Sequence, residues 1–201
     1  LYGSSGVTGL DNENITITGG SLTVTQANAI DLLTTGVVTA SIVTTETVDS
    51  LKTLTGTNNA YTIVISETSA SASDLNAING LTTATVDLTN VTSVTSSALS
   101  DLDTLATAIS DQEFINATNL ETSAVSDSEI DITSSAETIE ALDQIDDDSI
   151  DMTMASGATI NVDAGEIAAM LADEADGSLT IDDQNITVTG EISVEDANKL
   201  N

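Results

Sequence analysis

The chain has 201 residues, of which 33 are acidic and only two, Lys52 and Lys199, are basic, so the formal net charge is -31. Cys and His are absent, which excludes disulfides, thiolate nucleophiles, zinc knuckles and imidazole catalysis. A surface this acidic repels nucleic-acid phosphates and anionic lipid heads, and no apolar run reaches about 18 residues. We therefore expect no nucleic-acid partner and no membrane insertion.

The apolar content of 40% argues for a folded chain rather than an acidic disordered tail. One Phe and two Tyr are the only aromatic residues, and Trp is absent. Without large rings to fill a globular centre, the core has to be thin and evenly layered, and small aliphatic residues have to build it. This composition favours repetitive β structure.

Short Thr-rich apolar stretches recur along the chain and predict short β-strands. Each stretch alternates polar and apolar residues, or stays apolar, over about five positions. β-Branched side chains of this kind stack well on a pleated sheet. The predicted strands span residues 14–18, 21–24, 37–43, 61–66, 84–88, 129–133, 150–154, 158–162, 178–181 and 186–189.

Short amphipathic stretches alternate with these strands and predict short helices, each preceded by a Ser, Thr or Asp that can act as its N-terminal cap. Gly36, Gly56 and Gly80 lie just past three of these stretches, where a glycine commonly ends a helix. The predicted N-terminal caps are Thr25, Thr44, Ser71, Ser100, Ser134, Asp163 and Ser193.

A strand, a turn and a short helix recur every 20 to 34 residues or so, and a unit of that size is too small to fold alone. Stacked neighbours would bury a continuous core between a parallel sheet and a row of helices, with right-handed crossovers. We therefore predict an α/β fold, an elongated solenoid of short strand–helix repeats. Its plan is that of a leucine-rich-repeat horseshoe, although the leucine-rich consensus is missing. A doubly wound α/β domain is the competing interpretation, but its helices usually run longer.

The end of the chain repeats its beginning. Residues 181–201 match residues 10–31 when one position near Gly20 is skipped, and the second copy restarts at about residue 177. A chain that restarts its own opening is most simply a window from a longer tandem array, and we expect residues 1–201 to form one continuous array. The matched pairs include Asn14 with Asn185, Ile15 with Ile186, Gly19 with Gly190, Val24 with Val194, Ala27 with Ala197 and Asn28 with Asn198.

The acidic residues are unevenly placed, because residues 1–100 hold 8 of them and residues 101–201 hold 25. Crowded carboxylates repel one another, and hard divalent cations relieve this repulsion through oxygen ligands, so calcium is a possible stabiliser. The segment 173–183 partly resembles a calcium-binding loop. Ala172 occupies the first ligand position, however, so the segment is not an EF-hand. The alternative interpretation is a solvated acidic face. The candidate calcium ligands are Asp146, Asp147, Asp148, Asp173, Glu174, Asp176, Asp182 and Asp183.

Three functional alternatives depend on weaker patterns. Paired carboxylates could serve a glycosidase, but no aromatic platform is present to hold a sugar. Ser and Thr nucleophiles lack a His base, which leaves Lys52 as the candidate base for a hydrolase. Thr-x-Thr pairs could bind ice, but the predicted strands at 37–43 and 61–66 break that pattern. We expect a protein that is not an enzyme.

About one quarter of the chain carries a distinctive sequence pattern. Within residues 59–109, the run Asp74-Leu75-Asn76-Ala77-Ile78 is followed by Gly80, Thr82, Thr83, Val86 and Asp87. This part of the sequence resembles the Thr/Ser/Asp-rich repeats of very large cell-surface proteins of marine cyanobacteria. The resemblance implies an extracellular repeat region and carries over no catalytic residues.

These observations together predict a non-enzymatic extracellular structural module that serves as spacer, surface-layer or filament material. The ends of a solenoid present unpaired edges, so copies of the chain are expected to associate with one another into an array or filament. The alternative is a binding module, either an adhesin or a phage-type surface fibre that recognises a receptor.

Overall fold

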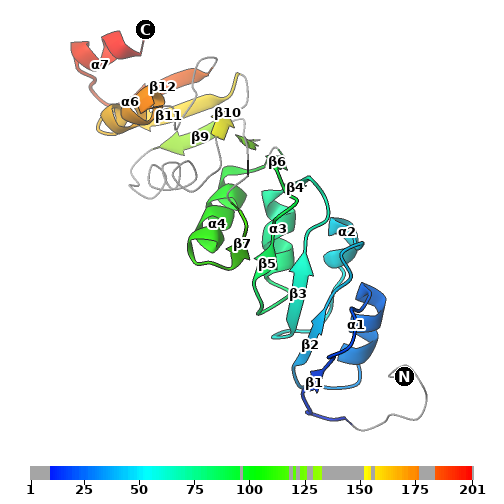
Figure 1. Ribbon diagram of the computed structural model, residues 1–201. Coiled ribbons are helices and arrows are strands. Elements are labelled where there is room, and N and C mark those ends of the chain that lie inside the picture. The colour runs from blue at the N-terminus through cyan, green and yellow to red at the C-terminus, as the bar shows by residue number, and fades with distance from the viewer. Residues whose placement is uncertain are drawn as a thin grey trace.

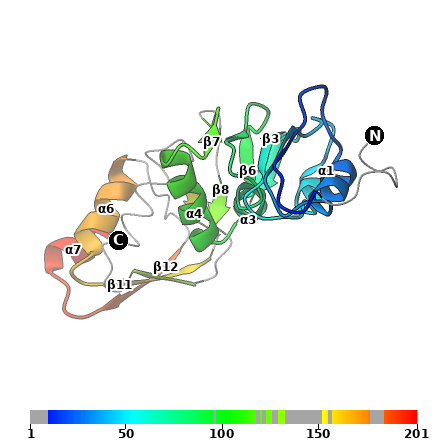
Figure 2. The same ribbon diagram turned by 90° about the horizontal axis from the view of Figure 1, so that it is seen from below.

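The computed structural model of the chain describes residues 10–95, 97–117, 120, 123–125, 129–132, 152–154, 157–176 and 184–200. The elements follow one another along the length of the molecule, and both views place the N-terminus and the C-terminal helix at opposite ends (Figures 1 and 2). None of the helices in these ranges is both long enough and apolar enough to cross a membrane.

The N-terminal half is built on a five-stranded, fully parallel sheet whose order, β1-β2-β3-β5-β7, is also the order of these strands along the chain. Ile15 lies opposite Val38, and Ile63 lies opposite Val86, so these two steps across the sheet span equal lengths of chain. The α/β class and the parallel sheet predicted from the sequence are confirmed. The strands are β1 (Ile15–Thr16), β2 (Val38–Ser41), β3 (Ala60–Val64), β5 (Val86–Asp87) and β7 (Phe114–Ile115).

Four helices accompany this sheet, and α2 contacts α3, which in turn contacts α4. Thr23, Thr47 and Ser71 cap the first three helices with their hydroxyl oxygens and are evenly spaced along the chain. Ser71 was correctly predicted, whereas the predicted caps Thr25 and Thr44 are wrong. The helices are α1 (Val24–Asp31), α2 (Val48–Leu51), α3 (Ala72–Asn79) and α4 (Leu99–Ser110).

The corrected caps have a simple physical reason. Thr25 lies inside α1, because Thr23 and Gln26 form a reciprocal capping box that starts the helix earlier. Thr44 lies too far ahead of α2, and Thr47 caps it instead. Helix α4 begins after Ala98 without a side-chain cap, so the predicted cap Ser100 is part of the helix. In a chain so rich in Ser and Thr, several neighbouring residues satisfy the same capping pattern.

Further strands lie outside the main sheet. β4 pairs in parallel with β6, β8 pairs in parallel with β10, and the C-terminal sheet has the order β12-β11-β9. β4 leads directly into α3, whose N-terminal cap, Ser71, is the last residue of that strand. The bounds are β4 (Ser69–Ser71), β6 (Ser93–Thr95), β8 (Ser123–Val125), β9 (Glu129–Ile132), β10 (Met152–Met154), β11 (Thr159–Asp163), α6 (Ile167–Asp176), β12 (Asn185–Thr189) and α7 (Val194–Lys199).

Most predicted strands are present but shorter than expected. The strand predicted at 21–24 is wrong, because Leu22 forms only an isolated bridge with Ile42 and Val24 already begins α1. The strands β4, β6, β7 and β8 were not predicted. The strand at 178–181 and the helix that Ser134 was predicted to cap lie outside the described residues.

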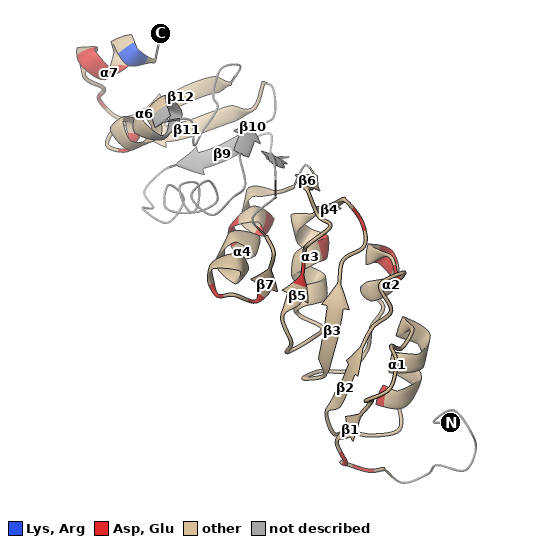
Figure 3. Cartoon of the chain, in the orientation of Figure 1, with Lys and Arg blue, Asp and Glu red and all other residues tan. Residues whose placement is uncertain are grey.

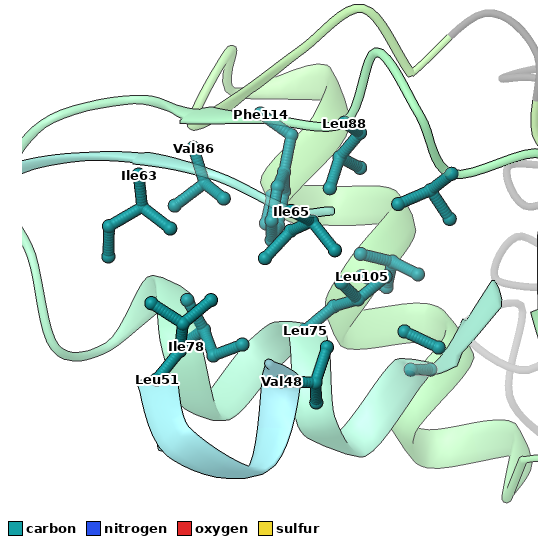
Figure 4. Packing of buried hydrophobic residues seen from close by; sticks show 14 of the residues in the cluster. Val48, Leu51, Ile63, Ile65, Leu75, Ile78, Val86, Leu88, Leu105 and Phe114 are labelled. Carbon is teal, nitrogen blue, oxygen red and sulfur yellow. The ribbon is translucent and has the colours of Figure 1, made fainter. Parts of the chain in front are cut away.

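Two opposed rows of aliphatic side chains form the core. In Figure 4, Ile63 and Val86 of the strands and Ile65, just after β3, face Leu51, Leu75 and Ile78 of the helices, and all six are fully or almost fully buried. Phe114 lies on the strand side of the same cluster. A single layer of Ile, Leu and Val thus separates sheet from helices, as a chain almost without rings requires.

The strands share one hydrogen-bonding polarity. Residues whose side chains point into the core donate their N–H groups to the following strand, as Ile17 does to Thr39 at 2.9 Å and Ile65 to Asp87 at 3.0 Å. In the C-terminal sheet, the exposed residue Asn185 donates its N–H back to Ala158 of the preceding segment at 2.9 Å. Alternate residues of a strand point their backbone groups to opposite edges. The backbone N–H and C=O groups of core residues therefore point to the next strand, and those of exposed residues point to the previous strand.

A matched pair of leucines tests the position of the core. Leu75 of α3 is fully buried, whereas Leu32, at the end of α1, is 84% exposed. We expect Leu75→Ala to lower the free energy of unfolding by about 2–5 kcal/mol, because it leaves a cavity in the aliphatic layer. Leu32→Ala should change it by less than about 0.5 kcal/mol. Urea unfolding followed by circular dichroism measures both, and equal effects would contradict the assigned core.

Candidate functional site: the contacts between successive units

Each main strand together with the helix that follows it forms one unit, and the polar chemistry of the N-terminal half lies where neighbouring units meet. The boundaries are set at the turn that leads into each strand. Unit 1 is residues 10–33, unit 2 is 34–57, unit 3 is 58–81 and unit 4 is 82–112, and the strand β12 with the helix α7 forms the C-terminal unit, residues 184–200.

The first backbone N–H of each of the helices α1, α2 and α3 is bonded by a side chain of the following unit. The first amides of a helix have no partner within the helix and need an acceptor from elsewhere. Here the N-terminal cap of the same unit satisfies one of them, and the next unit supplies a second acceptor. The donor–acceptor pairs are Val24 with Glu46 Oε1 at 2.9 Å, Val48 with Glu67 Oε1 at 2.7 Å, and Ala72 with Ser97 Oγ at 3.0 Å.

Hydroxyl groups hold the two capping carboxylates in place. The Ser50 hydroxyl donates to Glu46, and the Ser66 hydroxyl donates to Glu67 Oε2 at 3.1 Å. The hydrogen bond from Ser50, and then the one from the Val24 amide, hold the pKa of Glu46 below its ordinary value of 4.5, against the weaker effect of burial. Glu46 is therefore charged when it caps α1, where the helix dipole favours a negative group.

A second row of contacts joins neighbouring units. It lies one helical turn after the first residue of each helix. The side chain of Asn28 donates to the Thr53 carbonyl at 2.8 Å and accepts from the Thr55 amide at 2.9 Å. Asn76, at the equivalent position of α3, donates to the Asp101 carbonyl at 2.8 Å. Midway between them, Lys52 occupies the corresponding position after α2. Positions 28, 52 and 76 therefore all connect their unit to the next one.

Lys52 connects α2 to α3 through charge. Its Nζ lies 2.6 Å from Asp74 Oδ1 in the next unit and 3.0 Å from Asp49 Oδ1 in its own. The hydrogen bond to Asp74, followed by the one to Asp49, raises the pKa of Lys52, and the same contact with Lys52 lowers the pKa of Asp74. One of the two cations of the chain thus neutralises part of the acidic surface where two units meet.

The turns before β2 and β5 are joined to the preceding unit by a threonine at equivalent positions. The Thr34 hydroxyl donates to the Glu13 carbonyl at 2.6 Å, and the Thr82 hydroxyl donates to the Tyr61 carbonyl at 2.8 Å. Each hydroxyl oxygen also accepts the amide two positions further along the chain, that of Gly36 at 2.9 Å in the first turn. These hydroxyls therefore satisfy the backbone of two units at once.

Between units 2 and 3, a buried asparagine makes the hydrogen bonds that join one unit to the next. Asn59 is 1% exposed. Its Oδ1 accepts from the Val38 amide at 2.8 Å, and its Nδ2 donates to Asp31 Oδ1 at 2.8 Å. Asp31 belongs to unit 1, so this side chain connects three consecutive units. Burial of a polar amide is tolerated here because both of its ends are hydrogen-bonded.

Tyr61 is the one buried aromatic residue of unit 3. Its side chain is fully buried, and its hydroxyl has no hydrogen-bond partner among the described residues. Burial, and then the negative charge of Asp31, raise the pKa of Tyr61 to about 12. The phenol is therefore neutral at physiological pH and fills space in the core as an apolar ring would.

Two adjacent surface grooves are lined mainly by polar residues. One, of about 450 Å³, lies between units 3 and 4 and is lined by Thr82, Thr83 and Glu113, with Asn79 donating to Glu113 Oε2 at 2.5 Å. The adjacent groove, of about 280 Å³, adds Asp103 and further polar residues. Within the part of the chain that the structure describes, no three acidic side chains gather closely enough to hold a metal ion.

The predicted calcium ligands are only partly covered by the structure. The backbone of three of them, Asp173, Glu174 and Asp176, lies in the last turns of α6. The other five lie outside the described residues: Asp146, Asp147, Asp148, Asp182 and Asp183.

Apart from Lys52, which the sequence offered as a candidate hydrolase base, the residues that join the units were not singled out from the sequence as functional. A signal for them does exist, because Asn28 and Asn76 stand at the same position of their helices, one turn after the first residue. The misplaced caps Thr25 and Thr44 concealed the even spacing that would have aligned these two positions.

Gly36 tests how closely units 1 and 2 approach each other. A Cβ atom at this position would collide with the Glu13 carbonyl and lie 2.7 Å from the Asn12 carbonyl oxygen, and neither backbone group can swing away. The predicted role of Gly36 as a helix end is therefore replaced by one in packing. We expect Gly36→Ala to lower the unfolding free energy by about 1–3 kcal/mol. Gly19→Ala, which meets open space, is the matched control in the same denaturation experiment and should be close to neutral.

The charge of Glu46 gives a pH test. We expect Glu46→Ala to cost about 1 kcal/mol of unfolding free energy near pH 7, the usual contribution of a helix cap. Because folding lowers the pKa of Glu46, this contribution is present above its ordinary value of 4.5 and is lost as the pH falls through the folded-state pKa. The difference between wild type and variant, measured by denaturation from pH 7 to pH 3, should therefore shrink. Glu13→Ala is the exposed control, and a difference independent of pH would argue against a charged cap.

Comparison with known proteins places no relative beside this chain. No model of a protein family matches it, and neither the characterised proteins nor the solved structures contain a significant match.

Proposed function

We propose that the chain is a non-enzymatic, extracellular structural repeat module, an elongated solenoid that acts as spacer, filament or surface-layer material of a larger cell-surface protein. The observation that carries this proposal is the row of side chains from one unit that complete the helix of the unit before it. In this row, Glu46 completes α1, Glu67 completes α2 and Ser97 completes α3.

Coupling of this kind suits a load-bearing element. Each unit contacts its neighbours through the parallel ladder, through the helix caps and through side chains such as Asn28 and Asn59. When stability resides in contacts between nearest neighbours, adding units lengthens the rod without requiring a larger core. The leucine-rich-repeat plan remains the proposed description of the array. The resemblance to repeats of very large cell-surface proteins supports an extracellular location.

The acidic surface suits an environment rich in cations. Acidic residues occur on every labelled helix from α1 to α7 in Figure 3, over the whole length of the molecule. Their mutual repulsion opposes compaction, and salt or divalent cations would reduce it. We therefore include calcium stabilisation in the proposal, with the acidic residues at 146–148, 173, 174, 176, 182 and 183 as the candidate ligands.

Sedimentation velocity and thermal melting test the proposal. A spacer should sediment as an elongated particle, with a frictional ratio clearly above that of a compact sphere of 20.5 kDa, and a compact particle would contradict the role. Calcium should raise the melting temperature more than NaCl of equal ionic strength does, and chelator should reverse the gain. A variant with Asp146, Asp147 and Asp148 changed to Asn, compared with one carrying Asp182→Asn and Asp183→Asn, would locate the effect. No gain beyond that of NaCl would refute specific calcium sites.

A further inference from the structure

The chain contains one Asn-Gly pair, Asn79–Gly80, which marks the end of α3. This pair is the sequence most prone to lose the asparagine amide, because glycine has no Cβ atom to hinder the approach of its backbone nitrogen to the neighbouring side chain. Asn79 is half-buried and Gly80 is exposed, and both line the groove beside Glu113. Water therefore reaches the pair, and whether it reacts depends on the local geometry.

Deamidation at this pair requires one defined attack. The backbone nitrogen of Gly80 loses its proton and forms a bond to Cγ of Asn79, the bond from Cγ to Nδ2 breaks, and Nδ2 leaves as ammonia. Water then opens the resulting succinimide ring at one of its two carbonyl carbons, which gives aspartate or isoaspartate. The reaction consumes one water and releases one ammonia, and it needs no oxidant or reductant. The attack is possible only when the nitrogen lies next to Cγ.

The end of α3 holds the backbone away from this geometry. The Gly80 N–H donates to the Asn76 carbonyl at 3.1 Å. The Asn79 carbonyl accepts from the Thr82 amide at 3.3 Å. Ring closure turns the peptide group between Asn79 and Gly80 about the Asn79 Cα–C bond, and this rotation breaks both hydrogen bonds. The nitrogen that would attack is therefore held, with its proton, in the hydrogen-bond pattern of the helix.

The α4–β7 turn, residues 111–113, holds the Asn79 side chain. Asn79 Nδ2 donates to Glu113 Oε2 at 2.5 Å, and a hydrogen bond to a carboxylate is stronger than one between neutral groups. Glu113 is in turn fixed by its backbone, because its N–H donates to the Ala108 carbonyl at 2.9 Å and its carbonyl accepts from the Val86 amide at 3.0 Å. The group that has to leave is thus bound by a residue 34 positions away in the sequence.

We infer that Asn79 is a conditional deamidation site, protected while the α4–β7 turn lies against the end of α3 and reactive once this contact opens. The reaction replaces a hydrogen-bond donor by a carboxylate that faces the carboxylate of Glu113 and is repelled by it. The new charge also lies at the C-terminal end of α3, where the helix dipole disfavours a negative group. The original contact cannot re-form, so an opening that leads to reaction weakens this junction permanently. This inference goes beyond the proposed structural role and does not depend on it.

The rate of deamidation at residue 79 tests this protection. Full-length chains are incubated at mildly alkaline pH and physiological temperature, either folded or in urea, and samples are taken over time. An Asp-specific protease then cuts before Asp74 and Asp87 and releases residues 74–86. Isoaspartate at residue 79 raises the mass of this fragment, aspartate there adds a further cleavage, and tandem mass spectrometry assigns the site.

Variants at Glu113 separate the side-chain contact from folding, which circular dichroism checks for each chain. We expect folded Glu113→Ala to deamidate about fivefold faster than the folded wild type, the usual weight of one side-chain hydrogen bond. Glu113→Gln still offers an oxygen to Asn79 Nδ2 and should react at close to the wild-type rate. The wild type itself should react at least about tenfold faster in urea than when folded. Equal rates in these two states, or a folded Glu113→Ala chain no faster than the wild type, would overturn the inference.

Gly80→Ala is the matched control for the chemistry. A Cβ atom at this position would lie 3.6 Å from the Ala77 carbonyl oxygen, an ordinary contact, and the backbone there is helical with φ at -65°. This chain should fold as the wild type does and deamidate at residue 79 about tenfold more slowly in urea, because the added methyl group hinders the attack. An unchanged rate in urea would show that the nitrogen of residue 80 is not the attacking group and would contradict the assigned site.

The effect of the product on the junction can be measured directly. Asn79→Asp places a carboxylate opposite Glu113, and we expect it to lower the melting temperature by about 2–4 °C. Adding Glu113→Gln removes the facing charge and should recover most of this loss. A melting temperature that Asn79→Asp leaves unchanged, or a loss that Glu113→Gln does not relieve, would refute the permanent weakening of the junction.

Discussion

The first amide of each short helix in the N-terminal half is satisfied by a side chain of the next unit, and the rest of the architecture depends on this constraint. A peptide N–H withdrawn from water must find an acceptor, and the first amides of a helix have none within the helix itself. Glu46, Glu67 and Ser97 provide those acceptors from outside the unit. Units 1, 2 and 3 are therefore each completed by the unit that follows, which ties their stability to the presence of that successor.

The same dependence explains how a chain almost without aromatic residues builds a core. One aliphatic layer lies between the strands and the helices. Each further strand and helix lengthens this layer and adds buried area without making the layer thicker. Asn59 hydrogen-bonds groups of two preceding units, and Thr82 hydrogen-bonds both backbone groups of Tyr61 in the unit before it. Because core residues are bonded to the following strand and exposed residues to the preceding one, the two edges of the sheet present different backbone groups.

The presence of strands and helices was easier to predict from the sequence than the residues at which they begin and end. The β-branched runs around Val38 and Ile63 indicated strands because alternation is a local property of the sequence. Thr25 and Thr44 were chosen as caps although Thr23 and Thr47 fill that role, since capping patterns overlap where Ser and Thr are abundant. The short strand β4 was missed because Ser69 to Ser71 spans only three residues with Ala70 as its one apolar side chain, too few to show an alternating pattern.

The amino-acid sequence by itself determined the α/β class, the parallel direction of the strands, the thin aliphatic core and the acidic surface, because composition and short-range periodicity carry these properties. Only the tertiary structure decided which polar residues act between units. Glu46 reaches Val24 across 22 residues, and Asn59 reaches Asp31 across 28. These partners meet because the sheet brings residues about one unit apart side by side, and that register results from the packing of strands and helices together rather than from any local stretch of sequence.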